Sequence, residues 1–129
     1  MKTRAWTRPA MLTAVLLAGT AFGSAQAEPL AGEKIYKQHC AACHAIKPDA
    51  PTGMGPNLHG VVGREAGKMP GYSYSPAFKK ALNGEKWTPA LLDKWLEQPQ
   101  DVAKGTYMMY QQPDASVRAA LIEYLSTVK

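Results

Sequence analysis

The sequence contains only two cysteines, Cys40 and Cys43, and three histidines among its 129 residues. A closed structural zinc site needs four ligands, and His39 and His44 flank the cysteines too closely to complete a tetrahedron with them. A redox disulfide is the second alternative for a C-x-x-C pair. That interpretation expects a thioredoxin-like βαβ pattern around the cysteines, and the sequence has none.

Long hydrophobic runs are also scarce. After residue 27, no apolar segment approaches the roughly 20 residues that a membrane-spanning helix needs. The sequence has no internal repeat, no low-complexity segment and no strand-like alternation of useful length. It has no arginine-rich run either, so we expect no nucleic-acid binding.

The first 27 residues have the pattern of a secretory signal peptide. Lys2, Arg4 and Arg8 precede an apolar stretch from Ala10 to Phe22, and Ala25-Gln26-Ala27 matches the A-x-A cleavage pattern. We predict that residues 1–27 are a signal peptide cleaved after Ala27, that residues 28–129 form one domain, and that the protein is exported to the periplasm. An uncleaved anchor is the alternative. The segment holds three of the 15 basic residues and no acidic ones, so cleavage lowers the net charge from +5 to +2.

Helical patterns separated by Gly- and Pro-rich segments account for the remaining chain. The first helix should run from about Leu30 into the cysteine pair. Ser75-Pro76 and Thr88-Pro89 each place a capping residue before a proline, so helices should begin there. Gly84 should end the first of these two helices, and Pro99 should lie just beyond the second.

The last helix should begin near Asp114, a good N-cap residue. Its apolar residues recur at helical spacing and should pack on the first helix: Val117, Leu121, Tyr124, Leu125 and Val128. We expect loops at residues 45–75 and 100–112. The first is so long and so rich in apolar residues that we expect it to surround a bound group.

The cysteine pair carries the strongest functional signal. In Cys40-Ala41-Ala42-Cys43-His44, two thiols lie three residues apart and a histidine follows directly. This is the attachment signature of a c-type haem. On a helical turn, residues i and i+3 share a face, so both sulfurs can reach the vinyl groups at one edge of a porphyrin. His44 is then carried beneath the ring, where it can bind the iron. The motif predicts one covalent haem c.

Together with further motifs in the same order, the sequence resembles the class I cytochromes c, which are small single-haem proteins of mitochondria and bacteria. The resemblance covers Gly32 to Leu125 and rests on these segments after the haem motif: Gly55-Pro56-Asn57-Leu58-His59-Gly60, Val62-Gly63-Arg64, Pro70-Gly71-Tyr72-Ser73-Tyr74-Ser75, Trp87, Leu96-Glu97-Gln98-Pro99, Gly105-Thr106-Tyr107-Met108 and Leu121-Ile122-Glu123-Tyr124-Leu125. It implies an all-α class I cytochrome c fold, with about four to five helices around one covalent haem.

The resemblance also implies the ligands of the haem. Cys40 and Cys43 would form the two thioethers, His44 would be the proximal iron ligand and Met108 the distal one. The carbonyl of Pro56 would accept a hydrogen bond from the other ring nitrogen of His44, which fixes the tautomer of the imidazole.

Three further residues, Arg64, Tyr74 and Trp87, match positions that hold the haem propionates. Without the resemblance, Tyr74 and Trp87 would be packing aromatics and Arg64 a surface charge. Met108 and Met109 would both be gap-filling core residues. The resemblance also matches Gly32 and Tyr124 to a tight crossing of the first and last helices. His39 and His59 are interpreted as surface histidines without a role.

The sequence departs from the family beside the distal ligand and around the haem edge. Trp95 stands where mitochondrial members have a Tyr that hydrogen-bonds the Met sulfur. The lysine ring around the exposed haem edge is thin, with Tyr107 and His39 at two of its positions. The remaining candidates are Lys34, Lys37, Lys68, Lys79, Lys80 and Lys104. This pattern argues against a strongly acidic docking partner.

These patterns predict a monomeric single-electron carrier of the periplasm that serves respiratory or dehydrogenase redox partners. It would not be an enzyme and would not be stably inserted in a membrane. Two alternatives remain open. The chain could be the cytochrome subunit of a larger periplasmic oxidoreductase, or a haem enzyme or sensor with an open sixth iron position.

Overall fold

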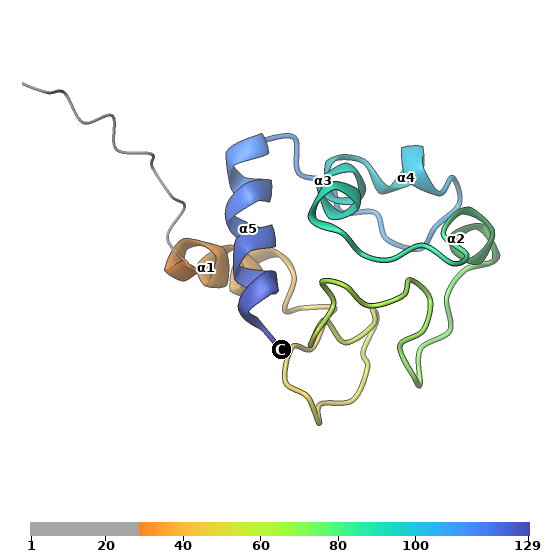
Figure 1. Ribbon diagram of the computed structural model, residues 1–129, viewed down its shortest axis with the longest axis horizontal. Helices are drawn as coiled ribbons and strands as arrows, with labels where there is room; N and C mark the ends of the chain where they lie inside the picture. The colour runs from red at the N-terminus through yellow and green to blue at the C-terminus, as the bar shows by residue number, and fades with distance from the viewer. Residues whose placement is uncertain (1–28) are drawn as a thin grey trace, which may run out of the picture.

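The computed structural model describes residues 29–129, so the predicted signal peptide at residues 1–27 lies outside the described residues. The elements are α1 (Pro29–His39), α2 (Pro76–Ala81), α3 (Pro89–Glu97), α4 (Pro99–Val102) and α5 (Ala115–Thr127) (Figure 1). Residues 29–129 contain no strand, and one isolated bridge pairs Glu65 with Lys86. The all-α prediction is confirmed. No helix in residues 29–129 is both long and apolar enough to cross a membrane.

Capping side chains begin three of the helices. The Ser75 hydroxyl accepts a hydrogen bond from the backbone N–H of Phe78 at 3.1 Å, and the Thr88 hydroxyl accepts one from Leu91 at 3.1 Å. The Asp114 carboxylate accepts from the backbone N–H groups of residues 116 and 117 at 2.8 and 3.3 Å. Each bond satisfies an N–H group that has no partner inside its helix. The predicted starts of α2, α3 and α5 are confirmed.

The predicted loop from Gln100 to Gln112 is partly wrong, because its first residues are helical. Pro99 does more than follow α3, since it is the first residue of the short helix α4. Gln98 lies between the two helices with an extended backbone. A proline has its φ angle preset for the first helical position and needs no N–H partner there, so it can start a new turn directly after α3.

Helices α1 and α5 cross in direct contact at Gly32 (Figure 1). A Cβ atom at Gly32 would lie 2.2 Å from the carbonyl oxygen of Ala120 and 2.4 Å from the Cβ atom of Tyr124. Only glycine permits this approach, although glycine inside a helix costs about 0.5–1 kcal/mol relative to alanine. The predicted crossing of Gly32 with Tyr124 is confirmed.

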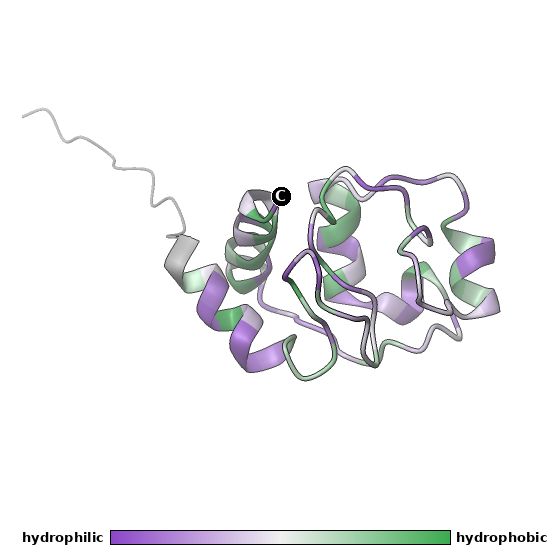
Figure 2. Cartoon of the chain, turned by 90° about the horizontal axis from the view of Figure 1, so that it is seen from below, coloured by the Kyte–Doolittle hydropathy of each residue, from purple (hydrophilic) through white to green (hydrophobic). Residues whose placement is uncertain are grey.

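The apolar side of α5 is wider than its predicted stripe. Leu121 and Leu125 are buried as expected, and Ala120 and Ile122 are buried as well. The remaining stripe positions, residues 117, 124 and 128, are half-buried. Helix α5 contacts both α1 and α3, so it is covered from two directions. Figure 2 shows more hydrophobic colour along α5 than along α1.

An aromatic cluster connects α2, α3 and the chain between them. The Phe78 ring stacks on Tyr74 at 4.7 Å and meets Trp95 edge-on at 5.4 Å between ring centroids. Trp87 and Trp95 meet edge-on at 5.5 Å. Such contacts are each worth about 0.5–1.5 kcal/mol beyond the area they bury. The cluster is one wall of the cavity described next, and the long segment of residues 40–75 runs along another side (Figure 1).

Candidate haem-binding site

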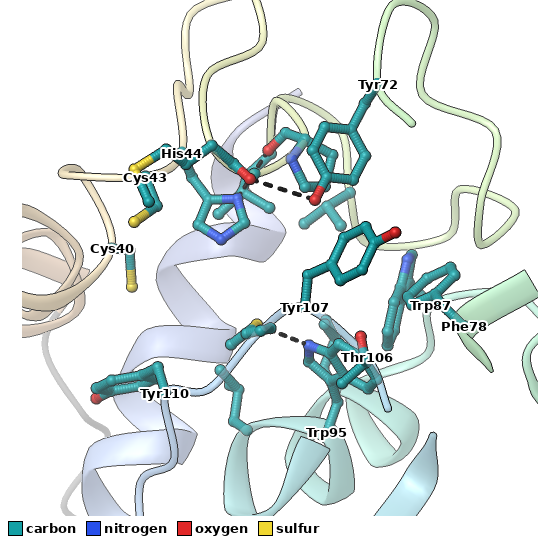
Figure 3. A pocket seen from close by; sticks show the side chains of 18 of the residues that line it. Cys40, Cys43, His44, Tyr72, Phe78, Trp87, Trp95, Thr106, Tyr107 and Tyr110 are labelled. Carbon is teal, nitrogen blue, oxygen red and sulfur yellow. Dashed lines mark hydrogen bonds between the residues drawn. The ribbon is translucent and has the colours of Figure 1, made fainter. Parts of the chain in front are cut away.

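A cavity of about 380 Å³ opens beside the cysteine pair, within the size range of cofactor sites. Its walls come from the 39–58 segment, the aromatic cluster, the 106–110 loop and α5. The structure brings every site residue expected from the sequence to this cavity: Cys40, Cys43, His44, Pro56, Arg64, Tyr74, Trp87 and Met108. Figure 3 shows Cys40, Cys43, His44 and Trp87 around it.

The two cysteines lie on a tight turn that continues from the end of α1. Backbone N–H groups of Cys43 and His44 both donate to the carbonyl of Cys40, at 3.0 and 2.9 Å. The two cysteines are not joined by a disulfide, and Cys40 is buried. Burial, with the neighbouring Cys43 second, raises the pKa of Cys40 to about 11. A redox C-x-x-C motif instead lowers the pKa of its attacking thiol, so this environment disfavours the redox-disulfide alternative.

The His44 imidazole is oriented by a backbone carbonyl. Its Nδ1 lies 2.8 Å from the carbonyl oxygen of Pro56, so Nδ1 carries the hydrogen and Nε2 keeps the lone pair that a metal needs. Burial lowers the pKa of His44, while the bond to Pro56 opposes this shift. The imidazole is therefore neutral at neutral pH. Figure 3 shows the ring pointing into the cavity from the side of the two cysteines.

The opposite wall presents the sulfur of Met108. The indole N–H of Trp95 donates to Met108 Sδ at 3.1 Å, so the tryptophan at this position does supply the hydrogen bond (Figure 3). Met108 is half-buried, whereas its neighbour Met109 is 75% exposed at the mouth of the cavity. The two adjacent methionines are thus in different environments, and the cavity has a nitrogen donor on one wall and a sulfur donor on another.

Arg64 supplies a positive charge to the same cavity. Its guanidinium donates to the carbonyls of His59 and Asn57, both at 2.9 Å. Burial lowers the pKa of Arg64, and the nearby Tyr74 opposes this shift. Among the ion pairs of residues 29–129, none involves Arg64. A half-buried cation without a carboxylate fits an anionic group bound in the cavity, because burying an unpaired charge is costly.

The donor set fits a haem better than a bare metal ion. No group of three or more Cys, His, Asp or Glu side chains in the described part of the chain could hold a metal. One imidazole and one thioether are the axial ligands of iron in cytochromes c. The apolar walls suit a porphyrin face, and the Arg64 guanidinium suits its carboxylates.

Comparisons with known proteins agree with this assignment. Residues 27–125 match the family model described as "Cytochrome C oxidase, cbb3-type, subunit III". Cytochrome c2 of Rhodopila globiformis is 44% identical over 104 residues, which cover 79% of this chain and 94% of the relative. Cytochrome c2 of Rhodomicrobium vannielii is 40% identical over 119 residues, 92% of each chain. The chain belongs to the cytochrome c family.

Solved structures give the same result. The cytochrome c2 structure from Rhodospirillum centenum has a TM-score of 0.72 and 34% identity, covering 79% of this chain and 98% of that one. Cytochrome cH from Methylobacterium extorquens has a TM-score of 0.69 and 38% identity, covering 78% of this chain and 98% of that chain. This cytochrome c therefore has the class I fold, carries a covalent haem c with iron, and transfers single electrons rather than catalysing a reaction as an enzyme.

Three residues of this cytochrome c site had no role in the sequence interpretation. The Tyr36 hydroxyl donates to the carbonyl of His44 at 2.6 Å and so holds the backbone of the haem motif. At Gly55, a Cβ atom would lie 2.3 Å from Cε1 of His44, so only glycine lets this loop approach the imidazole. Gln100 contacts the loop that carries Met108. Only the helical position of Tyr36, one turn before Cys40, could have indicated its role.

The interpretation of His59 as a surface residue is wrong. His59 is half-buried, and its Nδ1 lies 3.3 Å from the carbonyl oxygen of Ile46. Its backbone N–H donates to the Asn57 side chain at 2.8 Å, and its carbonyl accepts from Arg64. His59 therefore joins the turn that orients Arg64. His39 is exposed as expected, and its ring lies 5.7 Å from that of Tyr110.

Proposed function

We propose that Cys40 and Cys43 form the two thioethers to haem c, and that His44 and Met108 are the axial ligands of its iron. One observation carries the proposal: the two candidate ligands line one cavity, and each is oriented by a hydrogen bond to another residue of the cavity wall. Pro56 orients the imidazole and Trp95 the thioether. When bound, the haem supplies one-electron chemistry through the ferric and ferrous states of its iron.

The residues around the ligands keep them in one geometry. The Pro56 carbonyl holds the His44 tautomer, and the buried Trp95 ring is packed between Phe78 and Trp87. Ligands that stay in place in both oxidation states need little rearrangement when an electron is transferred. Arg64, Tyr74 and Trp87 are proposed to hold the propionates, with Arg64 providing the opposing charge.

We propose that the protein works in the periplasm after removal of residues 1–27. The signal-peptide pattern supports this, and so does the membership of bacterial cytochromes c2 among the relatives. Mass spectrometry of the exported protein should give an N-terminus at Glu28 and one haem that denaturation and acid–acetone do not extract. Replacing Cys40 and Cys43 together by Ser should abolish haem retention.

The mouth of the cavity is the proposed contact surface for redox partners. The large hydrophobic side chains of residues 29–129 that are most exposed are Met54, Tyr107 and Met109, at 80%, 64% and 75%, and all three line this mouth. We call them the apolar rim. The residues that line the cavity include no Lys, Asp or Glu. A partner that contacts this surface would therefore gain mainly from apolar burial, with little dependence on salt.

The apolar rim also favours a second candidate function, the cytochrome subunit of a larger periplasmic oxidoreductase. Exposed apolar patches commonly mark protein interaction sites. Size-exclusion chromatography of the native periplasmic extract separates the two. A haem-containing peak at the monomer position supports the free carrier, and a stable larger peak supports the permanent subunit.

The axial ligand can be tested with the two adjacent methionines. Met108→Ala should open the sixth iron position, lower the reduction potential and let carbon monoxide bind the ferrous haem rapidly. Met109→Leu is the matched control, because it preserves volume and apolar character and such changes usually cost less than about 1.5 kcal/mol. The weak long-wavelength charge-transfer band from Met sulfur to ferric iron should disappear only in Met108→Ala. Loss of this band in Met109→Leu alone would overturn the assignment.

A further inference from the structure

The side chain of Gln100, in helix α4, contacts the loop that carries Met108. Its Nε2 lies 3.0 Å from the carbonyl oxygen of Thr106 and 3.3 Å from that of Met108. Its Oε1 accepts from the backbone N–H of Gly105 at 2.9 Å. One amide therefore meets both donor and acceptor groups of residues 105–108, which a primary amide can do because it has both functions.

The Met108 loop has few other attachments of its own. Its backbone bonds begin with Thr106 N–H to the Ala103 carbonyl at 2.9 Å and resume with Gln112 N–H to the Leu96 carbonyl at 2.7 Å. Between these points, in the described chain, residues 107–111 make no backbone–backbone hydrogen bond. The Gln100 amide is thus the partner of the Met108 backbone carbonyl in a stretch that lacks backbone pairing.

The two methionine sulfurs are contacted by different donors. Trp95 Nε1 donates to Met108 Sδ at 3.1 Å at the cavity wall, whereas Gln100 Nε2 lies 3.5 Å from the exposed Met109 Sδ. The Nε2 group has two hydrogens for three nearby acceptors, namely two carbonyls and this sulfur. Gln100 therefore contacts the backbone of the loop and the methionine that faces outward, while Trp95 contacts the one that faces inward.

We propose that Gln100 is a positioning residue that keeps the Met108 sulfur at the haem iron. This inference rests on the proposed role of Met108 as axial ligand. Gln100 acts through the loop backbone, and it is not among the residues that line the cavity. Its loss should let the loop move away and the iron–sulfur bond open more often, with the rest of the fold intact.

Two substitutions in the covalent haem protein separate the functions of the amide. Gln100→Leu removes donor and acceptor at similar size, and Gln100→Glu keeps an acceptor for Gly105 but presents a carboxylate to the carbonyls of Thr106 and Met108. Gln38→Leu is the matched control, because Gln38 is exposed on α1 and does not line the cavity. Each variant is compared with wild type in three measurements: carbon monoxide binding to the ferrous form, the pH at which the ferric Met–iron charge-transfer band disappears, and thermal unfolding.

We expect carbon monoxide binding to be about tenfold faster or more in both Gln100 variants, since two neutral hydrogen bonds typically contribute this much to an opening equilibrium. The charge-transfer band should disappear at lower pH than in wild type, and Gln38→Leu should behave like wild type. Unchanged binding rates and band pH in both variants would overturn the proposal. So would a change confined to thermal unfolding, which would show that Gln100 only stabilises the fold.

Met108→Ala distinguishes failure of this inference from failure of the proposed function. If carbon monoxide binds rapidly to Met108→Ala but slowly to both Gln100 variants, Met108 is the ligand and Gln100 does not position it. If Met108→Ala itself binds carbon monoxide as slowly as wild type, the assignment of the ligand fails first, and the role of Gln100 fails with it.

Discussion

The hydrogen bond from Trp95 to Met108 should raise the reduction potential of the haem. A donor withdraws electron density from the sulfur, and the electron-poor ferric iron loses more from this than the ferrous iron does. The bond at 3.1 Å therefore favours the ferrous state. Removing it should stabilise the ferric state and lower the potential.

The size of this effect follows from the usual strength of a hydrogen bond. A neutral hydrogen bond contributes about 0.5–1.5 kcal/mol net. For a one-electron couple, about 59 mV corresponds to a tenfold change in equilibrium constant, or about 1.4 kcal/mol. If the hydrogen bond had its full strength in the ferrous state and none in the ferric state, the potential would change by roughly 20–60 mV. This range is an upper bound, because part of the bond persists in the ferric state.

The assay compares Trp95→Phe with Trp95→Tyr by redox titration. Both substitutions lose the same large indole and disturb the same contacts with Phe78 and Trp87, at 5.4 and 5.5 Å between centroids. They differ only in the hydroxyl, which in Trp95→Tyr is available as a donor to the Met108 sulfur in place of the indole N–H. We expect a lower potential for Trp95→Phe than for Trp95→Tyr. Equal potentials, with the charge-transfer band intact in both, would refute the reasoning.

Three further outcomes are expected. Gly32→Ala should lower the free energy of unfolding, measured by urea titration, by about 1–3 kcal/mol, because its methyl group would overlap the backbone of Ala120. The haem spectrum should stay unchanged. Burial raises the pKa of Tyr36, so the folded state holds the phenol proton more tightly than the unfolded state does. The free energy of unfolding should therefore fall as pH rises above 10.0. Urea titrations at several pH values should show a weaker fall in Tyr36→Phe. Electron-transfer rates with a physiological partner should vary little with salt, whereas Tyr107→Lys, which adds a charge to the apolar rim, should make stopped-flow rates clearly salt-dependent. A steep salt dependence already present in wild type would contradict the apolar contact.

The sequence by itself determined those features that depend on residues close together along the chain. The two cysteines share a helical turn because residues i and i+3 face the same side, and His44 follows from the same turn. The capping side chains of Ser75, Thr88 and Asp114 bond to N–H groups two or three residues away. Such signals can be read in a short window, and the helix starts that they predicted are confirmed.

Family resemblance extended the prediction to the cavity. It selected residues as distant as Pro56 and Met108, and the structure brings them to the same cavity as the cysteine pair. It also matched Gly32 to the crossing of the first and last helices, whereas the helical cost of glycine does not by itself name the partner of Gly32. The resemblance left open whether Trp95 donates to the Met sulfur. That depends on where a ring in α3 lies relative to a loop 13 residues further along the chain.

Only the tertiary structure decided the contacts of Tyr36, Gly55 and Gln100. The Tyr36 hydroxyl reaches the His44 carbonyl because α1 turns sharply at the cysteines, and Gly55 is required because a loop approaches the imidazole from another direction. Gln100 reaches the Met108 loop because α4 begins directly after α3, which the sequence interpretation treated as a loop. Each contact joins segments whose relative position is set by packing, and packing combines contributions from residues far apart in the chain. The apolar rim has the same origin, since residue 54 and residues 107 and 109 lie far apart in the sequence and come to one cavity only in the folded chain.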